Sequence, residues 1–203
     1  MADHATDHVT DVRIPIDRRA ALLRAAREVL AEKGLDAARV SEIVARAGVA
    51  QGTFYLYFPS KYSLVVALTE QVMDQVLVAV EEAVAGTSTL REAIAAGVTA
   101  AFRATEGYRD IIGTLHSSAG SVEIRVECER LYEPYYAYVA EMIRGGQATG
   151  EVDAAVSPEL TGRLIVGLIE HAADACYVFH TETPTEDYVS EVARFIQRAL
   201  GIL

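Results

Sequence analysis

The sequence lacks tryptophan altogether and contains only five prolines and two cysteines in 203 residues. So few prolines, with abundant Ala, Leu, Val and Glu, favour helices, because proline interrupts a helix more strongly than any other residue. The two cysteines, Cys128 and Cys176, lie far apart, and neither has a partner at metal-ligand spacing. We therefore interpret both as reduced, buried side chains; a redox pair is the alternative, and no metal site is expected.

Long apolar segments are also missing. A run such as residues 164–169 is interrupted at once by Glu170, and no run reaches the roughly 20 residues that a membrane span needs. Residues 1–10 are polar and acidic, unlike the basic and then apolar pattern of an export signal. The sequence therefore predicts a cytoplasmic protein with no membrane partner.

Positive charge is scarce overall and unevenly distributed. The net charge is −11, yet residues 13–62 hold nine Lys and Arg against five acids, whereas residues 63–203 hold nine against 21. Binding to DNA needs a basic face and not a basic protein. The asymmetry indicates two parts with different tasks, of which the first suits a polyanion.

Hydrophobic periodicity predicts helices along the chain after residue 16, and no segment alternates as a strand does. Asp17 can cap a first helix that Gly34 ends, and Ser60 can cap a long helix over residues 61–85. The other helices are predicted over residues 40–47, 51–58, 87–105, 108–115, 121–144 (kinked at Pro134 and ended by Gly145-Gly146), 157–180 and 184–200. The sequence thus predicts an all-α fold with a flexible arm (1–16), a helix-turn-helix domain (17–62) and a helical bundle (63–203).

The segment over residues 39–61 narrows the function, and it reads RVSEIVARAGVAQGTFYLYFPSK. Gly48 permits the left-handed turn between two short helices, and Phe54 and Phe58, four residues apart, can anchor the second helix to the core. The residues then left to face a major groove are Gln51, Gly52, Thr53, Tyr55 and Tyr57.

The chemistry of these outward residues suits DNA. Gln51 can pair with adenine, Thr53 can touch a thymine methyl or a phosphate, and Gly52 permits close approach of the backbone. The hydroxyls of Tyr55 and Tyr57 can reach phosphates. Lys61 adds charge at the start of the next helix. The alternative is a helical hairpin packed only for its own stability.

This segment resembles the TetR family of bacterial repressors, whose characteristic pattern is Ala-Gly-Val-x-x-Gly-Thr-Phe-Tyr-x-Tyr-Phe-x-x-Lys; the resemblance spans about residues 18–68. It implies a repressor that binds a palindromic operator as a homodimer through residues 157–180 and 184–200, with a small-molecule effector held in the bundle. The DNA contacts that it implies are Arg39, Ser41, Gln51, Gly52, Thr53, Tyr55, Tyr57 and Lys61. Arg39 and Ala50 depart from the pattern, because Thr or Ser usually caps the helix at these positions.

The acidic bundle offers weaker signals. Leu160, Leu164 and Leu168 form an apolar stripe that suits a dimer interface. Tyrosines around Pro134 suggest a pocket, although packing is the alternative for them. The candidate ligand-binding residues are Arg109, His116, Tyr132, Tyr135, Tyr136, His171, Asp174 and Tyr177. Their spacing does not support a metal set.

Tyr and aliphatic residues favour a lipophilic or aromatic effector. No cofactor is expected. Four arginines, Arg103, Arg109, Arg125 and Arg130, suit an anionic head group such as that of an acyl-coenzyme A, whereas the acidic surplus equally suits a lipophilic cation. We favour the acyl ester. The expected mechanism is a ligand-dependent shift of helices 61–85 and 108–115 that changes the separation of the two recognition helices.

Other classes of protein are weaker interpretations. The sequence has no glycine-rich phosphate loop, no GxSxG elbow and no HExxH motif, so an enzyme is not expected. The alternative that we retain is a structural or adaptor protein that binds DNA without a ligand. An adaptor of this kind should have a bundle core filled with side chains, whereas a ligand-responsive regulator should have a cavity there.

Overall fold

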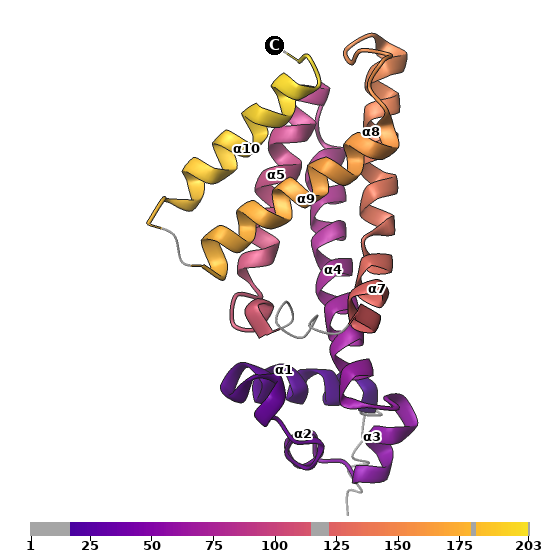
Figure 1. Cartoon of the computed structure of the whole chain (residues 1–203), viewed down its shortest axis with the longest axis vertical. Helices are drawn as coiled ribbons and strands as arrows, with labels where there is room; N and C mark the ends of the chain where they lie inside the picture. Colours follow the sequence, from indigo (N-terminus) through magenta and orange to yellow (C-terminus); the bar gives the residue numbers. More distant parts are fainter. Residues whose placement is uncertain (1–16, 115–121, 180–181, 203) are drawn as a thin grey trace, which may run out of the picture.

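The computed structural model describes residues 17–114, 122–179 and 182–202. The described residues contain helices and no strands, which confirms the all-α prediction. The helices named in Figure 1 are α1 (Arg18–Ala37), α2 (Val40–Ala47), α3 (Gln51–Tyr57), α4 (Lys61–Ala85), α5 (Leu90–Glu106), α7 (Val122–Leu131), α8 (Glu133–Thr149), α9 (Pro158–Tyr177) and α10 (Thr185–Ala199). The predicted arm, residues 1–16, lies outside the described residues.

Local chemistry sets the start of α1 and the turn after α2 as expected. The Asp17 carboxylate accepts hydrogen bonds from the backbone N–H groups of Arg19 and Ala20, at 3.0 and 3.1 Å. At Gly34 the helical geometry of α1 breaks, with φ at 72°. Gly48 turns the chain from α2 toward α3 in the left-handed conformation, with φ at 67°, which residues with a Cβ adopt only at a cost.

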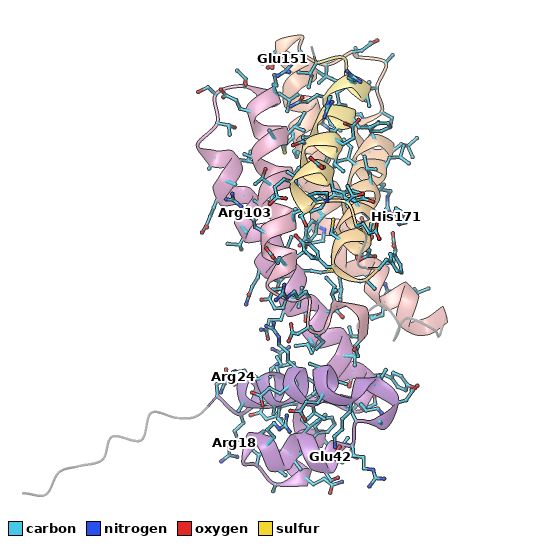
Figure 2. All side chains as sticks on the ribbon, turned by 90° about the vertical axis from the view of Figure 1, so that its left-hand side faces the viewer. Arg18, Arg24, Glu42, Arg103, Glu151 and His171 are labelled. Carbon is cyan, nitrogen blue, oxygen red and sulfur yellow. The ribbon has the colours of Figure 1, made fainter. Side chains whose placement is uncertain are left out.

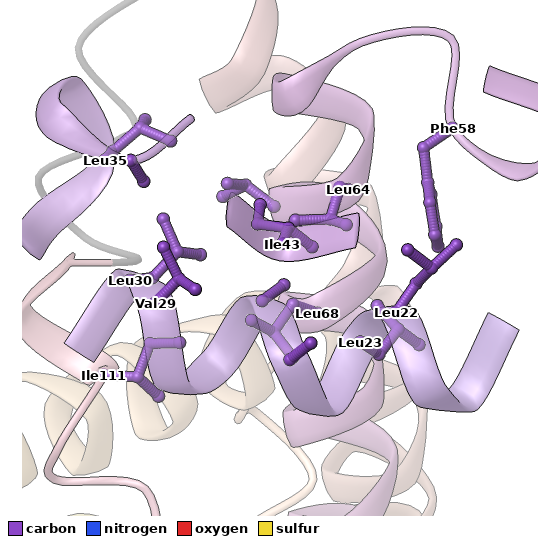
Figure 3. Packing of buried hydrophobic residues seen from close by; sticks show 14 of the residues in the cluster. Leu22, Leu23, Val29, Leu30, Leu35, Ile43, Phe58, Leu64, Leu68 and Ile111 are labelled. Carbon is purple, nitrogen blue, oxygen red and sulfur yellow. The ribbon is translucent and has the colours of Figure 1, made fainter. Parts of the chain in front are cut away.

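Helices α1, α2 and α3 form a compact unit at the base of α4, with the bundle above it (Figure 2). Their shared core contains Leu22, Leu30, Ile43 and Leu64, all fully buried (Figure 3). This core also takes in Ile111 from the segment after α5. The N-terminal unit is therefore packed against the bundle and not only tethered to it.

Helix α4 is the one described helix that is long and apolar enough to cross a membrane by length and composition. No such segment is expected from the hydrophobic runs in the sequence. The structure accounts for the composition differently, because Leu64 and Leu68 pack in the N-terminal core while Val80 and Val84 line a cavity in the bundle. The apolar residues of α4 are therefore divided between the N-terminal core and the cavity of the bundle.

The remaining helices surround α4 in the bundle. Helix α5 packs along α4, α8 packs on α9, and α10 packs on α5 and α9 (Figure 1). A second core between them contains Ile94, Phe102, Ile143, Ile165 and Ile196.

The prediction of one kinked helix over residues 121–144 is wrong. The chain forms two helices, α7 and α8, that meet at Tyr132. Pro134 stands in the first turn of α8, where its missing N–H costs no hydrogen bond. Nor do Gly145-Gly146 end the helix, which continues to Thr149 because Gly150, with φ at 80°, supplies the left-handed cap.

Several other boundaries differ from the predictions; among them, α1 continues beyond Gly34 to Ala37 and α9 ends at Tyr177. Helix α5 is capped by Thr89 and not by Thr87 or Ser88. Residues 107–111 form turns, and only residues 112–114 of the predicted helix 108–115 are helical among those described. Helix α10 begins after Pro184 without a side-chain cap.

The paired glycines of α8 differ in what surrounds them. A Cβ on Gly146 would lie 2.6 Å from Leu90 Cδ2 and 2.7 Å from Val152 Cγ2, whereas a Cβ on Gly145 would meet nothing within 4 Å. We expect Gly146→Ala to lower the free energy of unfolding by about 1–3 kcal/mol through overpacking. Gly145→Ala should raise it by about 0.5–1 kcal/mol, because alanine favours the helix. Urea unfolding of both variants checks the pair, and equal shifts would contradict the expected role of Gly146.

Candidate functional site

The exposed side of α3 gathers residues that the sequence analysis assigned to DNA. Phe54 and Phe58 are buried, and they fix the helix on the core. The side chains of Tyr55 and Tyr57 are 52% and 44% exposed. Gln51 and Gly52 are also exposed and Thr53 is half-buried. We call Gln51, Gly52, Thr53, Tyr55 and Tyr57 the recognition surface.

The two helices of this motif begin without the usual side-chain caps. Arg39 and Ala50 occupy the N-cap positions, and neither side chain makes a capping hydrogen bond. At α2 the Glu42 carboxylate instead accepts a hydrogen bond from the Arg39 N–H at 3.1 Å, which satisfies one of the free donors of the first turn. Arg39 and Ser41 are exposed at this end of α2, so their side chains are accessible to a ligand of the recognition surface.

Lys61 has a structural role that the sequence did not reveal. Its ammonium donates hydrogen bonds to the carbonyls of Leu35 and Ala38, at 2.5 and 3.0 Å. These bonds fasten the end of α1 to the start of α4. An ammonium has three N–H donors, so one donor remains for a phosphate.

Three of the eight described Lys and Arg residues in the first 62 positions form ion pairs. Lys33 pairs with Glu42, and Arg46 pairs with Glu32, both at 2.6 Å. The described arginines of this segment that enter no ion pair are Arg18, Arg19, Arg24 and Arg39. Arg18 and Arg24 project from the N-terminal part of the chain (Figure 2). They are phosphate-binding candidates that the charge count alone did not single out.

The bundle holds a partly enclosed cavity of about 380 Å³. Its lining follows α4 from Thr69 to Val84 and α5 from Leu90 to Thr105. At 1.5 Å per helical residue, each of these stretches is about 22 Å long. One end, near Leu90 and Leu200, is lined by aliphatic side chains, so the cavity suits an elongated ligand with an apolar tail.

Polar groups gather toward the other part of the cavity. The Tyr132 hydroxyl donates a hydrogen bond to the Glu170 carboxylate, and the Tyr135 hydroxyl donates one to the Met73 carbonyl. Burial raises the pKa of both tyrosines, so both remain protonated donors. The charged residues in the described lining are Glu129, Glu170 and Asp174.

The structure brings only some of the predicted ligand residues together. Tyr132, Tyr135 and Asp174 line the cavity. Tyr136 stacks on Tyr132, with ring centroids 6.0 Å apart, and Tyr177 donates a hydrogen bond to the Phe102 carbonyl at 3.1 Å.

Other predicted residues lie elsewhere. Arg109, His171 and Arg130 are exposed and do not line the cavity. Arg103 lines a shallow surface hollow instead, and in Figure 2 it projects from the side of the bundle opposite His171. His116, like the side chain of Arg125, lies outside the described residues. Tyr138, a member of the tyrosine cluster around Pro134, also lines the cavity. The lining residues Glu129 and Glu170 were not predicted, because tyrosine clustering did not reveal which helix faces meet.

A polar contact joins α1 to the segment that follows α5. The Arg27 guanidinium donates hydrogen bonds to the Asp110 carboxylate at 2.9 and 2.6 Å and to the Gly107 carbonyl at 2.6 Å. It also lies over the Tyr108 ring, 4.6 Å from the centroid, and the Tyr108 hydroxyl donates to Gln75 of α4. The hydrogen bond from Arg27 lowers the pKa of Asp110. We call this contact the Arg27 clamp.

The Arg27 clamp lies between the two candidate sites. Thr105 and Ile112, on either side of Gly107 and Asp110 in the sequence, line the cavity. Movement of this segment by a ligand would therefore reach α1 directly. No local pattern indicates the contact between Arg27 and Asp110, because the two residues are 83 positions apart.

The outer face of α9 is apolar and exposed. Leu160 and Leu164, one helical turn apart, are 67% and 73% exposed. Phe195 of α10 is 60% exposed. Exposed apolar side chains in register on one helix are typical of a protein interface.

Comparison with known proteins extends these observations. Residues 22–68 match a family described as bacterial regulatory proteins of the tetR family. Residues 94–200 match the tetracyclin repressor-like C-terminal domain. The chain is 35% identical over 181 residues to the uncharacterized HTH-type transcriptional regulator YvdT of Bacillus subtilis, covering 89% of this chain and 93% of that protein.

Two further similarities concern other regulators of Bacillus subtilis. The fatty acid metabolism regulator protein is 28% identical over 151 residues, which cover 73% of this chain and 78% of that protein. The crystal structure of the transcriptional regulator FadR in complex with stearoyl-CoA superposes with a TM-score of 0.77 at 24% identity, covering 91% of this chain and 98% of that one. The structural likeness shows that the two chains share a fold.

Proposed function

The chain belongs to the TetR family of bacterial transcriptional regulators, and we propose that it is a repressor which a small hydrophobic effector releases from a palindromic operator. The observation that carries this proposal is the presence, in one chain, of an exposed recognition surface and a partly enclosed apolar cavity. A DNA-binding adaptor without a ligand would need no such cavity. We assign no catalytic residue, and we place the protein in the cytoplasm, where operator DNA is found.

The division of the chain follows from the same features. We assign residues 17–62 to DNA binding and residues 63–203 to effector binding and dimerisation, with residues 1–16 as an arm. Fluorescence anisotropy with DNA from upstream of the protein's own gene, at two salt concentrations and with excess non-specific competitor, tests DNA binding. Specific binding that weakens with salt is expected. Failure to bind that DNA, together with failure to enrich any site from a random pool, would contradict the proposal.

Dimerisation through the outer faces of α9 and α10 completes this proposal. A two-fold dimer presents two recognition surfaces to the half-sites of a palindrome. The exposed leucines of α9 offer the apolar centre that such an interface needs. Residues 157–180 and 184–200 are the segments that we assign to it.

We expect Leu164→Glu to raise the dissociation constant of the dimer about 10- to 100-fold, because each buried leucine would be replaced by a charge in an apolar interface. Val78→Glu is the matched control: Val78 is also exposed, at 50%, but lies on α4. Analytical ultracentrifugation measures both. A Leu164→Glu variant that stays as dimeric as the control would place the interface elsewhere.

The effector that we propose is a long-chain acyl ester. The length and aliphatic lining of the cavity support an acyl tail. The two fatty-acid-related names among the similar proteins lend further support. The described lining contains carboxylates and no Lys or Arg, which favours an uncharged ester carbonyl over a free carboxylate inside the cavity. A thermal-shift panel of acyl esters, fatty acids and lipophilic cations of equal chain length tests this choice. Stabilisation by the cations alone would contradict it.

Filling the cavity should block the effector without disturbing DNA binding. Ala173 of α9 is buried and lines the cavity. We expect Ala173→Leu to weaken effector binding about 5- to 150-fold, because overpacking costs about 1–3 kcal/mol. Ala137→Leu, at an exposed position of α8, is the control. Isothermal calorimetry with an acyl ester measures the effect. Equal affinities of the two variants would mean that the ester binds outside the cavity.

A further inference from the structure

Leu56 is the residue of α3 that the proposed function does not use. Its side chain is 82% exposed, more than that of any other large hydrophobic residue in the described part of the chain. A single exposed leucine is ordinary on a protein surface. Its position is not ordinary, because it lies on the helix that carries the recognition surface, between the exposed Tyr55 and Tyr57.

Helix geometry places Leu56 at the outermost point of α3. Successive residues of an α-helix are rotated by about 100°. Leu56 is two residues from each of Phe54 and Phe58, the two buried anchors, and therefore projects away from the core. Gly52, one turn earlier, lies on the same side with nothing within 4 Å of its Cβ position. The side of α3 that projects farthest from the core thus consists of Gly52 followed by Leu56.

The chemistry of this line limits what it can recognise. Leucine has no hydrogen-bonding atom, so it gains nothing from a phosphate or from the polar edge of a base. The apolar group that the major groove offers is the C5-methyl of thymine. Gly52 lets the backbone approach the bases, while the hydroxyls of Tyr55 and Tyr57, rotated to either side, can hold phosphates.

We propose that Leu56 determines sequence specificity by packing on the C5-methyl of a thymine in each operator half-site. This inference rests on the proposed function, in which α3 enters the major groove. It adds a residue to the recognition surface and an expected base to the operator. Leu56 is exposed in the free protein, and its burial against the methyl group would remove this apolar surface from water and so favour binding.

Deoxyuridine in place of thymidine tests the proposal, because it removes the methyl group and keeps every hydrogen-bonding atom of the base. A duplex enriched by the wild-type protein from a random pool is the probe, with each thymine pair of the two half-sites replaced in turn. At one position we expect binding to weaken about fourfold per methyl, or about 15-fold for both half-sites. Leu56→Ala should bind the thymine duplex correspondingly less tightly and should not respond to deoxyuridine at that position.

Thr53→Ser is the matched control, since it removes the other aliphatic methyl group of this helix face. It should keep the deoxyuridine response that Leu56→Ala loses. If Leu56→Ala weakens binding equally to thymine and deoxyuridine duplexes, or if the response is lost in Thr53→Ser instead, the inference is overturned while the regulator function stands. If the wild-type protein enriches no duplex at all, the proposed function itself fails. Equal thermal midpoints of the three proteins exclude a folding defect.

Discussion

Gly52→Glu should abolish operator binding, with a loss of affinity on the order of 100-fold or more, while the protein stays folded. A Cβ at Gly52 meets nothing within 4 Å, so the new side chain projects freely from α3. It would carry a negative charge into a groove between two phosphate backbones, and like charges at an interface cost several kcal/mol. Helix stability should rise slightly, because glycine is a poor helix former.

Two controls separate charge from bulk in this experiment. Gly52→Gln has nearly the same shape without the charge and should lose less affinity. Gly86→Glu adds the same charge at an exposed glycine beyond the far end of α4, also with open space around it, and should bind DNA as the wild type does. Anisotropy titrations against an enriched duplex measure all three. Wild-type affinity of Gly52→Glu would mean that α3 does not face DNA.

Loss of the Arg27 clamp should uncouple the effector from DNA binding. In Arg27→Ala we expect the effector to lower DNA affinity by less than about fivefold, against as much as about 100-fold in the wild type, the span of ordinary allosteric coupling. The reason is geometric. The segment between the cavity residues Thr105 and Ile112 holds α1 through the Arg27–Asp110 contact, so its displacement can no longer be transmitted along that route.

The Arg27 clamp is partly exposed, with side-chain exposures of 33% and 43%, and such pairs contribute little to stability. The variant should therefore fold and bind both ligands. Arg46→Ala is the control, because Arg46 makes a comparable ion pair with Glu32 that stays within the N-terminal unit. DNA titrations with and without the strongest acyl ester of the panel give the coupling. A fully responsive Arg27→Ala would assign transmission to α4 alone.

The features predicted correctly from the sequence are those that neighbouring residues determine. Gly34 and Gly48 adopt positive φ because the chain must turn there, and Asp17 and Ser60 cap the helices that follow them. The bounds of α2 and α4 agree with the prediction for the same reason. The spacing of Phe54 and Phe58 likewise revealed which side of α3 is buried.

The features that the sequence did not predict depend on contacts between distant segments. Position 146 of α8 requires glycine because Leu90 and Val152 leave no room for a side chain there. Lys61 turns toward two carbonyls of α1 that lie more than 20 residues earlier in the chain. Glu170 meets Tyr132 across two helices. No local sequence pattern encodes such long-range contacts. Contacts of this kind determine which polar groups reach the cavity.

The packing of α4 in both cores has a consequence for chimeric regulators, in which the effector-binding domain of one protein is joined to the DNA-binding domain of another. A junction at residue 62 would remove Leu64, Leu68 and Val72 from the core that supports α3. A junction after Val76 keeps these side chains, but it still discards Ile111, which packs in the same core. A functional chimera that contains the DNA-binding domain of this protein should therefore keep the first four turns of α4. It should also restore the packing between this domain and the segment that corresponds to residues 107–112.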